Sequence, residues 1–555
     1  MSSRQERAQR PFCTWWPWLA TVLATGVVLR VWGLRWGLPD EHHLFSYHPD
    51  EYHSLRGALA LACGDPNPHF FNYGSLYLYL VAVVCLWHQV VLGGPDLLSA
   101  LLRAPQAHTE MAAWVLDARL VVVVCAVATV WVAWLTGLRL AGLRGAVVAA
   151  AAMALAPLHV LNSHYATVDV PLTLFIALSL LFSVRHAMGG ASEPRWRDLL
   201  LSGACAGLAA SVKYNGAAVF VAPLVAEVMR GGREPLWPRL AAVVGAGALA
   251  FVAFAVTSPY VLLAWPEAWR DISFELRHMR VGEAPALAQY PNGWLFHLHP
   301  ALMMMALALL LGRGEARRGI LPALLFGIFW FGIIGSAGVR YARYELPLEP
   351  VGAMSLAVAV KGIVAARALQ WRQLSVAALV CWLGAALWTD VSRDRVMAGV
   401  DVREEMLRTV LERVAPEEPL GLLWEPWFSN APVDYCNGGA VLRRNPLFQR
   451  FQRPVRRLVV TAMDATTLAR SRPPWLLVSD LETDSGLQVA RWLPMAPGQG
   501  PEQGVRPYTV EAIATAPFPS DHPLRRYSAS DSRYPCPRLT LLQSTARTRE
   551  GSPSK

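Results

Sequence analysis

Two adjacent carboxylates, Asp50 and Glu51, lie between His48 and His53, shortly after the first long apolar run of the chain at 15–34. A carboxylate that is partly removed from water has a raised pKa, which suits a general base. We therefore predict that one carboxylate takes a proton from an acceptor hydroxyl or binds a metal ion, with the histidines lining the site. The structural alternative is a helix N-terminus, where the helix dipole favours acidic side chains.

A third carboxylate, Asp169, ends a short polar loop that also contains His164. Asp169 could orient a nucleophile, and His164 could line the same site. Together with Asp50 and Glu51 it could also bind a divalent cation, Mg²⁺ or Mn²⁺. The alternative for Asp169 is an N-cap of a helix that begins near Pro171.

Cationic side chains stand where a phosphate group could be bound. Lys213, followed by Tyr214, interrupts an otherwise apolar stretch, where a charge is costly and usually functional. Arg340 and Arg343 share a later loop, and the planar fork of arginine matches a phosphate. We expect all four side chains to contact a phosphate. The alternatives are a lysine that snorkels to the membrane surface and arginines that pair with Glu345 or with lipid.

The elements that must position these residues are apolar helices. Hydrophobic residues make up 54% of the chain and charged residues only 16%, which is outside the pattern of a soluble domain. Apolar runs of about 20 residues, long enough to cross about 30 Å of hydrocarbon, recur up to residue 390 and then stop. The predicted fold is mainly α: a polytopic transmembrane helical bundle over 1–390, followed by a small soluble α/β domain over 391–555.

About eleven spans are predicted, and basic loops set their orientation. The spans are expected at 15–34, 118–138, 143–161, 171–188, 199–212, 214–229, 239–259, 294–312, 319–338, 344–366 and 372–390. Five basic loops between them, at 139–144, 185–197, 230–239, 313–318 and 361–372, belong in the cytoplasm under the positive-inside rule. The odd number of spans then carries 391–555 to the outer side. Because the loops account for the net charge of +10, we do not expect nucleic acid as a partner.

One apolar run, 75–94, would reverse this orientation if it crossed the bilayer. We therefore predict that it lies at the membrane interface, within a long outer loop at 36–116. The loop at 260–293 contains an amphipathic stretch that also suits a helix lying on membrane lipids.

The C-terminal part, 391–555, combines a helical pattern at 402–414 with short apolar runs typical of strands. These runs are 420–424, 458–462, 475–478 and 539–542. The segment has no glycine-rich or DxD motif for a nucleotide.

Since nucleotide sugars are kept in the cytoplasm, an outward-facing transferase needs a donor that reaches the outer leaflet. A polyprenyl-phosphate sugar meets this need, because catalysis then requires only a base and cations for the departing phosphate.

The order of these motifs resembles the GT-C superfamily of membrane glycosyltransferases, in the branch of protein O-mannosyltransferases and the lipid A aminoarabinose transferase. The matching segments are 48–51, 71–77, 117–120, 164–171, 207–215 and 343–347. The resemblance implies an inverting transfer from a polyprenyl-phosphate sugar. It also implies that Asp50 is the base or positions the acceptor, that Glu51 and Asp169 are second acidic positions, and that Lys213 contacts the donor phosphate. The sequence departs from many relatives at Gly74-Ser75, where they have two prolines.

The resemblance leaves the acceptor open among a protein, a lipid and a glycan. It implies a bacterial inner membrane protein with the periplasm as its outer compartment. The main alternative is a transporter or flippase of envelope lipids, since polar residues in a membrane domain also mark transport paths. Charges at outer span ends favour surface chemistry over a path through the midplane.

Overall fold

The computed structural model describes residues 2–93, 107–189, 195–230, 235–281, 300–337, 341–365, 369–461, 465–483, 508–516 and 534–544. Its packing divides the chain into two compact units. Unit 1 comprises 1–31, 54–92 and 117–392, and unit 2 comprises 32–53, 93–116 and 393–555. Residues from the first long loop and from the C-terminal part therefore share one unit. Arg340, a predicted phosphate contact, lies outside the described residues.

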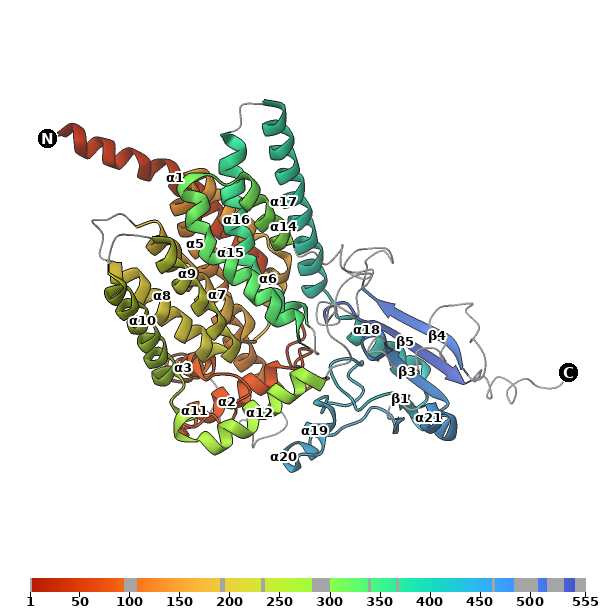
Figure 1. Ribbon diagram of the computed structural model, residues 1–555. Helices are drawn as coiled ribbons and strands as arrows, with labels where there is room; N and C mark the ends of the chain where they lie inside the picture. Colours follow the sequence, from red (N-terminus) through yellow and green to blue (C-terminus); the bar gives the residue numbers. More distant parts are fainter. Residues whose placement is uncertain are drawn as a thin grey trace. The chain divides into compact units, whose positions relative to one another are not determined.

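Unit 1 is built from helices (Figure 1). They are α1 (Ser2–Val31), α2 (Glu51–Ala62), α3 (Leu76–Leu92), α5 (Ala107–Ala154), α6 (Pro157–Asn162), α7 (Asp169–Ala187), α8 (Arg195–Val212), η1 (Tyr214–Phe220), α9 (Val221–Arg230), α10 (Leu236–Thr257), α11 (Pro259–Leu263), α12 (Trp265–Val281), α14 (Pro300–Leu311), α15 (Gly314–Gly335), η2 (Ala342–Glu345), α16 (Leu348–Val364) and α17 (Leu369–Met397). α2, α5 and α17 begin or end in unit 2.

Within the described residues the predicted spans fall mainly on helices, which confirms a mainly helical membrane protein. Residues 294–299, 338 and 366, which belong to three predicted spans, lie outside the described residues. Within the described residues, five helical stretches are long and apolar enough to cross a membrane: Ala107–Ala154, Asp169–Ala187, Leu236–Thr257, Gly314–Gly335 and Arg372–Arg413. The first holds two predicted spans, because a non-helical Gly142 (φ 72°) breaks it. The total of eleven spans, and the interfacial place of α3, stay predictions.

Two helices of unit 1 present apolar side chains to the outside. Leu240, Val244 and Phe251 of α10 and Val380 and Trp388 of α17 are exposed. An apolar surface of this extent is unfavourable in water and favourable against lipid tails. The two helices therefore have the surface expected of lipid-facing spans.

Close contact between α8 and α10 depends on small residues. A Cβ added at Gly203 would lie 2.3 Å from the carbonyl oxygen of Ala246, and one at Gly207 would lie 2.0 Å from that of Ala250. Small residues four positions apart allow helix backbones to approach each other in membranes. This pair of glycines fixes α8, whose end leads directly into Lys213.

Unit 2 contains a small mixed sheet with helices (Figure 1). Its elements are α18 (Val402–Arg413), β1 (Leu420–Leu422), α19 (Gly439–Arg443), α20 (Pro446–Gln449), β2 (Leu458–Val460), α21 (Ala465–Ser471), β3 (Trp475–Ser479), α22 (Asp480–Thr483), β4 (Tyr508–Thr515) and β5 (Arg538–Ser544). Among the described residues the strand order is β2-β1-β3-β5-β4. β1 is parallel to β2 and β3, whereas β5 is antiparallel to β3 and β4. The predicted helix and four predicted strands are confirmed, and β4 was not predicted.

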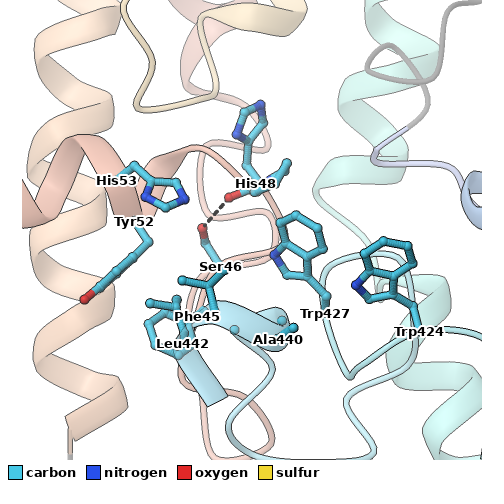
Figure 2. A pocket seen from close by; sticks show the side chains of 13 residues that line it. Phe45, Ser46, His48, Tyr52, His53, Trp424, Trp427, Ala440 and Leu442 are labelled. Carbon is cyan, nitrogen blue, oxygen red and sulfur yellow. Dashed lines mark hydrogen bonds between the residues drawn. The ribbon is translucent and has the colours of Figure 1, made fainter. Parts of the chain in front are cut away.

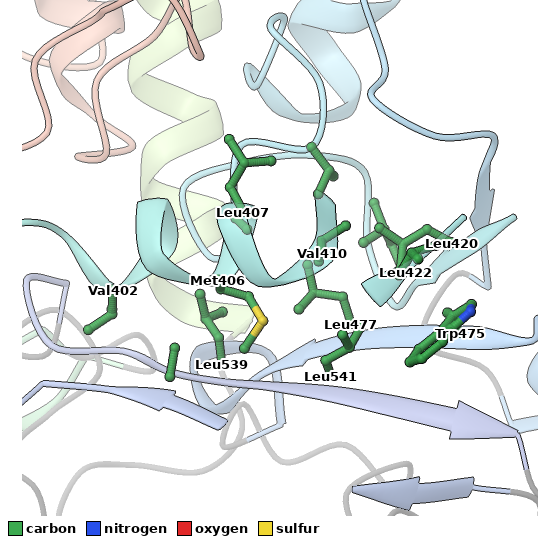
Figure 3. Close-up of a cluster of buried hydrophobic side chains, with 14 of the residues drawn as sticks. Val402, Met406, Leu407, Val410, Leu420, Leu422, Trp475, Leu477, Leu539 and Leu541 are labelled. Carbon is green, nitrogen blue, oxygen red and sulfur yellow. The ribbon is translucent and has the colours of Figure 1, made fainter. Parts of the chain in front are cut away.

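The core of unit 2 lies between α18 and the sheet. Figure 3 shows Met406 and Val410 of α18 facing Leu477 of β3 and Leu539 and Leu541 of β5. All five side chains are fully buried. The apolar face of α18 therefore packs on the central strands, and the side chain of Asp401 caps the start of the helix by accepting from the N–H of Arg403.

Candidate functional site

Helix α7 separates two polar ends of unit 1. Its 19 residues span about 28 Å, close to the thickness of a hydrocarbon core. Asp169 is its first residue, and Arg185 and His186 lie in its last turn. The two ends of unit 1 can therefore be compared through this one helix.

All five predicted basic loops meet at the end of unit 1 that holds Arg185. Hydrogen bonds and ion pairs join these loops to one another. The bonds run from Arg139 to the carbonyl oxygen of Met188 (2.6 Å), Lys361 to that of Leu140 (3.0 Å), Arg185 to Asp198 (3.2 Å), His186 to Glu227 (2.7 Å), Arg239 to Glu227 (2.9 Å) and Arg318 to the carbonyl oxygen of Met229 (2.9 Å). The sequence spacing that predicted one common side for these loops thus agrees with their packing.

The opposite end of α7 carries a buried charge cluster. The Nζ of Lys213 lies 2.8 Å from Oδ1 of Asp169, and the Nε of Arg343 lies 3.8 Å from Oδ2 of the same carboxylate. The exposed fractions of these side chains are only 13%, 5% and 7% for Lys213, Asp169 and Arg343. Three predicted site residues from distant parts of the chain therefore converge.

Local backbone structure places each member of this cluster. Lys213 has an extended backbone (φ −150°, ψ 128°) at the break between α8 and η1. Arg343 belongs to the short helix η2. Asp169 is the first residue of α7, whereas Val168 is the N-cap and makes no side-chain cap bond. The alternative in which Asp169 is an N-cap is therefore wrong, and its side chain faces the cations instead.

Tyrosine rings surround the two cations. The Nζ of Lys213 lies 4.6 Å from the ring centre of Tyr344 and 5.5 Å from that of Tyr73, and the guanidinium of Arg343 lies 4.2 Å from the ring centre of Tyr341. An aromatic face attracts a cation within about 6 Å. These rings therefore help to hold the two cations in place.

The segment 71–75 that carries Tyr73 is anchored by backbone contacts. The hydroxyl of Tyr214 lies 3.1 Å and 3.0 Å from the carbonyl oxygens of Phe71 and Tyr73. Gly74 approaches Ser211 so closely that an added Cβ would lie 2.1 Å from the Ser211 carbonyl oxygen. Gly74, the position at which the sequence departs from the two prolines of many relatives, is therefore also the position of this close backbone contact. The hydroxyl of Tyr214 has one proton, which it donates to these backbone carbonyl oxygens. The predicted contact of Tyr214 with a phosphate therefore stays a prediction.

The predicted base lies in unit 2, at the end of its first segment. His48 is buried, Asp50 is partly buried, and Glu51 is buried as the first residue of α2. The backbone N–H of Asp50 lies 3.3 Å from Nδ1 of His48. The helix N-terminus that was the structural alternative is therefore present, and it is compatible with a catalytic carboxylate.

A pocket of about 260 Å³ lies beside this segment in unit 2 (Figure 2). His48 and His53, both predicted to line the site, form part of its wall. The wall also contains Tyr52, Trp424 and Trp427, as well as Phe45, Ser46, Pro49 and residues 438–442. An aromatic pocket with a few polar groups is typical of a small-molecule or carbohydrate site. The tryptophans were not singled out from the sequence, because only folding brings them to the first loop.

His164, the third predicted lining residue, is a buried side chain of unit 1. Its Nδ1 lies 2.9 Å from the carbonyl oxygen of Val160, one turn earlier in α6. This bond orients the ring.

The predicted metal ligands fall in different units, Asp169 in unit 1 and Asp50 and Glu51 in unit 2. Their joint binding of a cation stays a prediction. Among the described residues, a different group has the atoms to hold a metal ion: Asp40, His43 and Glu404. Sequence reasoning missed this group, although Asp40-Glu41-His42-His43 is a dense run of possible ligands.

Residues 113–261 match the family model of dolichyl-phosphate-mannose-protein mannosyltransferases. The chain resembles this family. The matched segment includes Asp169 and Lys213, so the resemblance predicted from the motifs is confirmed over the part that holds the ion pair. The chain matches no curated protein.

Several solved structures of membrane glycosyltransferases are similar to this chain. ArnT from Cupriavidus metallidurans bound to undecaprenyl phosphate has 14% identity and a TM-score of 0.49, and the match covers 95% of this chain and 98% of that one. The Archaeoglobus fulgidus oligosaccharyltransferase has 11% identity and a TM-score of 0.44, with 85% and 70% covered. The S. cerevisiae protein O-mannosyltransferase complex has 19% identity and a TM-score of 0.34, with 45% and 34% covered. These similarities are low, so the functional interpretation rests on the family match and on side-chain geometry.

Proposed function

We propose that this protein transfers a sugar from a polyprenyl-phosphate-linked donor to an acceptor hydroxyl on the outer face of the membrane. The observation that carries the proposal is the buried cluster of Lys213, Arg343 and Asp169, at the end of unit 1 opposite the basic loops. Two of its three members lie in the segment that matches a family acting on dolichyl-phosphate mannose. The chemistry of each group fits one part of the transfer.

Lys213 and Arg343 bind the donor phosphate. As the bond between the anomeric carbon and the phosphate oxygen breaks, negative charge grows on the leaving phosphate, and fixed cations in a water-poor site stabilise it. A guanidinium has five N–H donors, so its contact with Asp169 is compatible with a phosphate contact. Asp169 acts as a positioning residue that holds the ammonium of Lys213 at a fixed point before the donor arrives.

Asp50 is the general base. The acceptor oxygen attacks the anomeric carbon from the side opposite the phosphate, its proton passes to the Asp50 carboxylate, and the polyprenyl phosphate leaves with the bonding electrons. This single displacement inverts the configuration at the anomeric carbon. Glu51, which is buried at the start of α2, is a second acidic position that supports the orientation of the segment.

The pocket beside His48 receives the acceptor. The indoles of Trp424 and Trp427 offer flat apolar faces for a sugar ring or an aromatic side chain, and His53 is exposed at the rim. The lining is compatible with a glycan, a lipid headgroup or a protein side chain as acceptor. Because the pocket belongs to the same unit as Asp50, the base and the acceptor would be held by one rigid part.

The topology that goes with this chemistry is a bundle of about eleven spans in a bacterial inner membrane. The end with the five basic loops faces the cytoplasm, and the cluster of Lys213 and residues 391–555 face outward. The run 75–94 lies at the interface. We also propose a divalent cation, Mg²⁺ or Mn²⁺, with Asp50, Glu51 and Asp169 as its candidate ligands.

Binding of a bare polyprenyl phosphate tests the donor site directly. The full chain in lipid nanodiscs would be titrated with undecaprenyl phosphate for the wild type, Lys213→Gln and Lys361→Gln. Lys361 is a matched control because it lies at the basic end, where its Nζ donates to the carbonyl oxygen of Leu140. A charge-assisted bond contributes about 1.5–3 kcal/mol, so Lys213→Gln should weaken binding roughly 10- to 100-fold while Lys361→Gln leaves it unchanged. Equal affinity for all three proteins would contradict the assignment, and transport of the lipid without sugar transfer would favour a flippase.

A further inference from the structure

Three possible metal ligands lie together in unit 2, outside the residues proposed for sugar transfer. Asp40 and His43 come from the first segment of the unit, and Glu404 lies in the first turn of α18. The Nε2 of His43 lies 3.6 Å from Oδ1 of Asp40 and 3.7 Å from Oε1 of Glu404. These separations are longer than hydrogen bonds and are those of loose ion pairs.

The other ring nitrogen of His43 fixes the tautomer of the neutral ring. Nδ1 lies 2.8 Å from the carbonyl oxygen of Phe45, which can only accept, so Nδ1 carries a proton and donates it. The neutral ring then has its lone pair on Nε2, which faces the two carboxylates. A backbone carbonyl that fixes the tautomer in this way is the usual outer partner of a metal-binding histidine.

The segment that holds His43 is rigidly attached within unit 2. The carbonyl oxygen of Phe45 also accepts from the side-chain amide of Asn437 at 3.1 Å, and the N–H of Phe45 donates to the same side chain at 3.0 Å. The N–H of Leu44 donates to the carbonyl oxygen of Tyr435 at 2.8 Å. His43 is 1% exposed, so its ring has one fixed direction.

Both carboxylates are oriented by donors of their own. The hydroxyl of Tyr47 donates to Oε1 of Glu404, and the ring of Tyr47 stacks on that of His43 at 4.2 Å. Oδ1 of Asp40 accepts from the backbone N–H of His42 at 2.8 Å. Asp40 is also the member most open to solvent, which provides an entry path and a place for a bound water.

We propose that Asp40, His43 and Glu404 bind a Zn²⁺ ion that joins the first segment of unit 2 to α18. One imidazole nitrogen, two carboxylate oxygens and a water are ligand types that Zn²⁺ accepts in four-coordinate sites, whereas Mg²⁺ and Ca²⁺ prefer oxygen alone. Two ligands held about 2.1 Å from a tetrahedral ion lie roughly 3.4 Å apart, close to the two separations at Nε2. The two carboxylates with a neutral ring balance the charge of the ion. By fixing 40–47, the ion would also steady the neighbouring segment of His48 and Asp50.

Cobalt binding by the full chain tests the site without any sugar donor or acceptor, so the result does not depend on the proposed transfer. Metal-free protein in detergent would be titrated with CoCl₂, and the absorption of tetrahedral Co²⁺ in the visible region would be followed before displacement by ZnSO₄. The variants are His43→Asn, Glu404→Gln and, as a matched control, His42→Asn, whose ring is an exposed neighbour in the same segment.

We expect about one equivalent of Co²⁺ in the wild type and in His42→Asn, with the bands removed by Zn²⁺. The bands should be absent in both His43→Asn and Glu404→Gln, and Zn²⁺ should raise the Tm of the wild type and the control alone. Circular dichroism checks that each variant is folded, and if one is not, the other carries the comparison. Absence of Co²⁺ bands in the wild type, or bands that persist in both ligand variants, would overturn the proposal.

Discussion

The ammonium of Lys213 lies 2.8 Å from the carboxylate of Asp169, although 44 residues separate them in the chain. Asp169 begins α7, and Lys213 follows the end of α8, so the pair joins the ends of two packed helices. A buried pair of this kind costs desolvation and is weak evidence for stability by itself. Its position within the family-matched segment, and beside Arg343, is the basis of our proposal that Asp169 positions Lys213 for a phosphate.

A double-mutant cycle should reveal this coupling. Asp169→Asn leaves the buried ammonium of Lys213 without its carboxylate, and Lys213→Gln leaves the buried carboxylate of Asp169 without its ammonium. Each single variant should therefore lose on the order of 3 kcal/mol of stability. The double variant should lose less than the sum, with an interaction free energy of about 1–3 kcal/mol. Chemical denaturation in detergent measures all four proteins. Strictly additive losses would show that the two side chains do not interact.

Arg343→Lys should impair donor use while it preserves the charge. Lysine cannot make a two-pronged contact with phosphate and packs differently on the ring of Tyr341, which lies 4.2 Å from the arginine guanidinium. We expect the KM for the donor to rise and kcat to fall, so that kcat/KM drops by roughly tenfold, because Arg343 is proposed both to bind the phosphate and to stabilise its charge as it leaves. Steady-state kinetics over a range of donor concentrations measures both. An unchanged kcat/KM for the donor would contradict the proposed role of Arg343 at the phosphate.

Gly74→Ala should destabilise unit 1 because the new Cβ would meet the backbone of Ser211 at 2.1 Å. Backbone cannot move aside cheaply, so the loss should reach about 1–3 kcal/mol or more. Gly332→Ala in α15 is the matched control, since its Cβ would meet nothing within 4 Å. The Tm of Gly74→Ala should fall, whereas that of Gly332→Ala should stay level or rise slightly. Equal Tm values for the two variants would show that the contact at Gly74 relaxes easily.

Glu482 should make unit 2 lose stability as the pH rises. Burial raises the pKa of its carboxyl from 4.5 to about 7, so the folded state binds a proton that the unfolded state releases. Its stabilising effect is complete below pH 4.5 and declines as the pH rises to about 7, by on the order of 3 kcal/mol. Glu482→Gln should flatten this part of the stability curve relative to the wild type. The exposed Glu417→Gln should leave the curve unchanged, and an unaltered slope in Glu482→Gln would contradict the assignment.

Much of the fold follows from local pattern, because each apolar run has one way to satisfy its backbone in a bilayer. The described parts of the predicted spans are mostly helical, as expected on that basis. The helix at 402–414 and the four short strands were predicted from their periodicity and apolar runs, and they are found in unit 2. β4 was missed although Tyr508–Thr515 alternates apolar and polar residues, since threonine, alanine and glutamate weaken its hydrophobic pattern. It also lies at the edge of the sheet, where pairing with β5 alone defines it.

The contacts between the candidate site residues could not be predicted from the sequence, because they depend on how distant segments pack. Asp169, Lys213 and Arg343 were each predicted, but their meeting depends on how α7, α8 and η2 pack. The sequence around Trp427 and Glu404 contains no functional motif. These residues become candidates for function only where the C-terminal part folds against residues 40–48. Chemistry that is assembled from distant segments is therefore visible only in the folded unit.

Sugar transfer from a polyprenyl-phosphate donor tests the central claim most directly. Membranes that contain equal amounts of folded wild type or Asp50→Asn would receive radiolabelled donor, and label in proteins, lipids and glycans would be counted separately. We predict that the wild type labels one class of acceptor and that Asp50→Asn lowers the rate by at least about 100-fold, as expected for loss of a general base. Absence of transfer with every polyprenyl-phosphate donor, or a rate that Asp50→Asn leaves unchanged, would contradict the account.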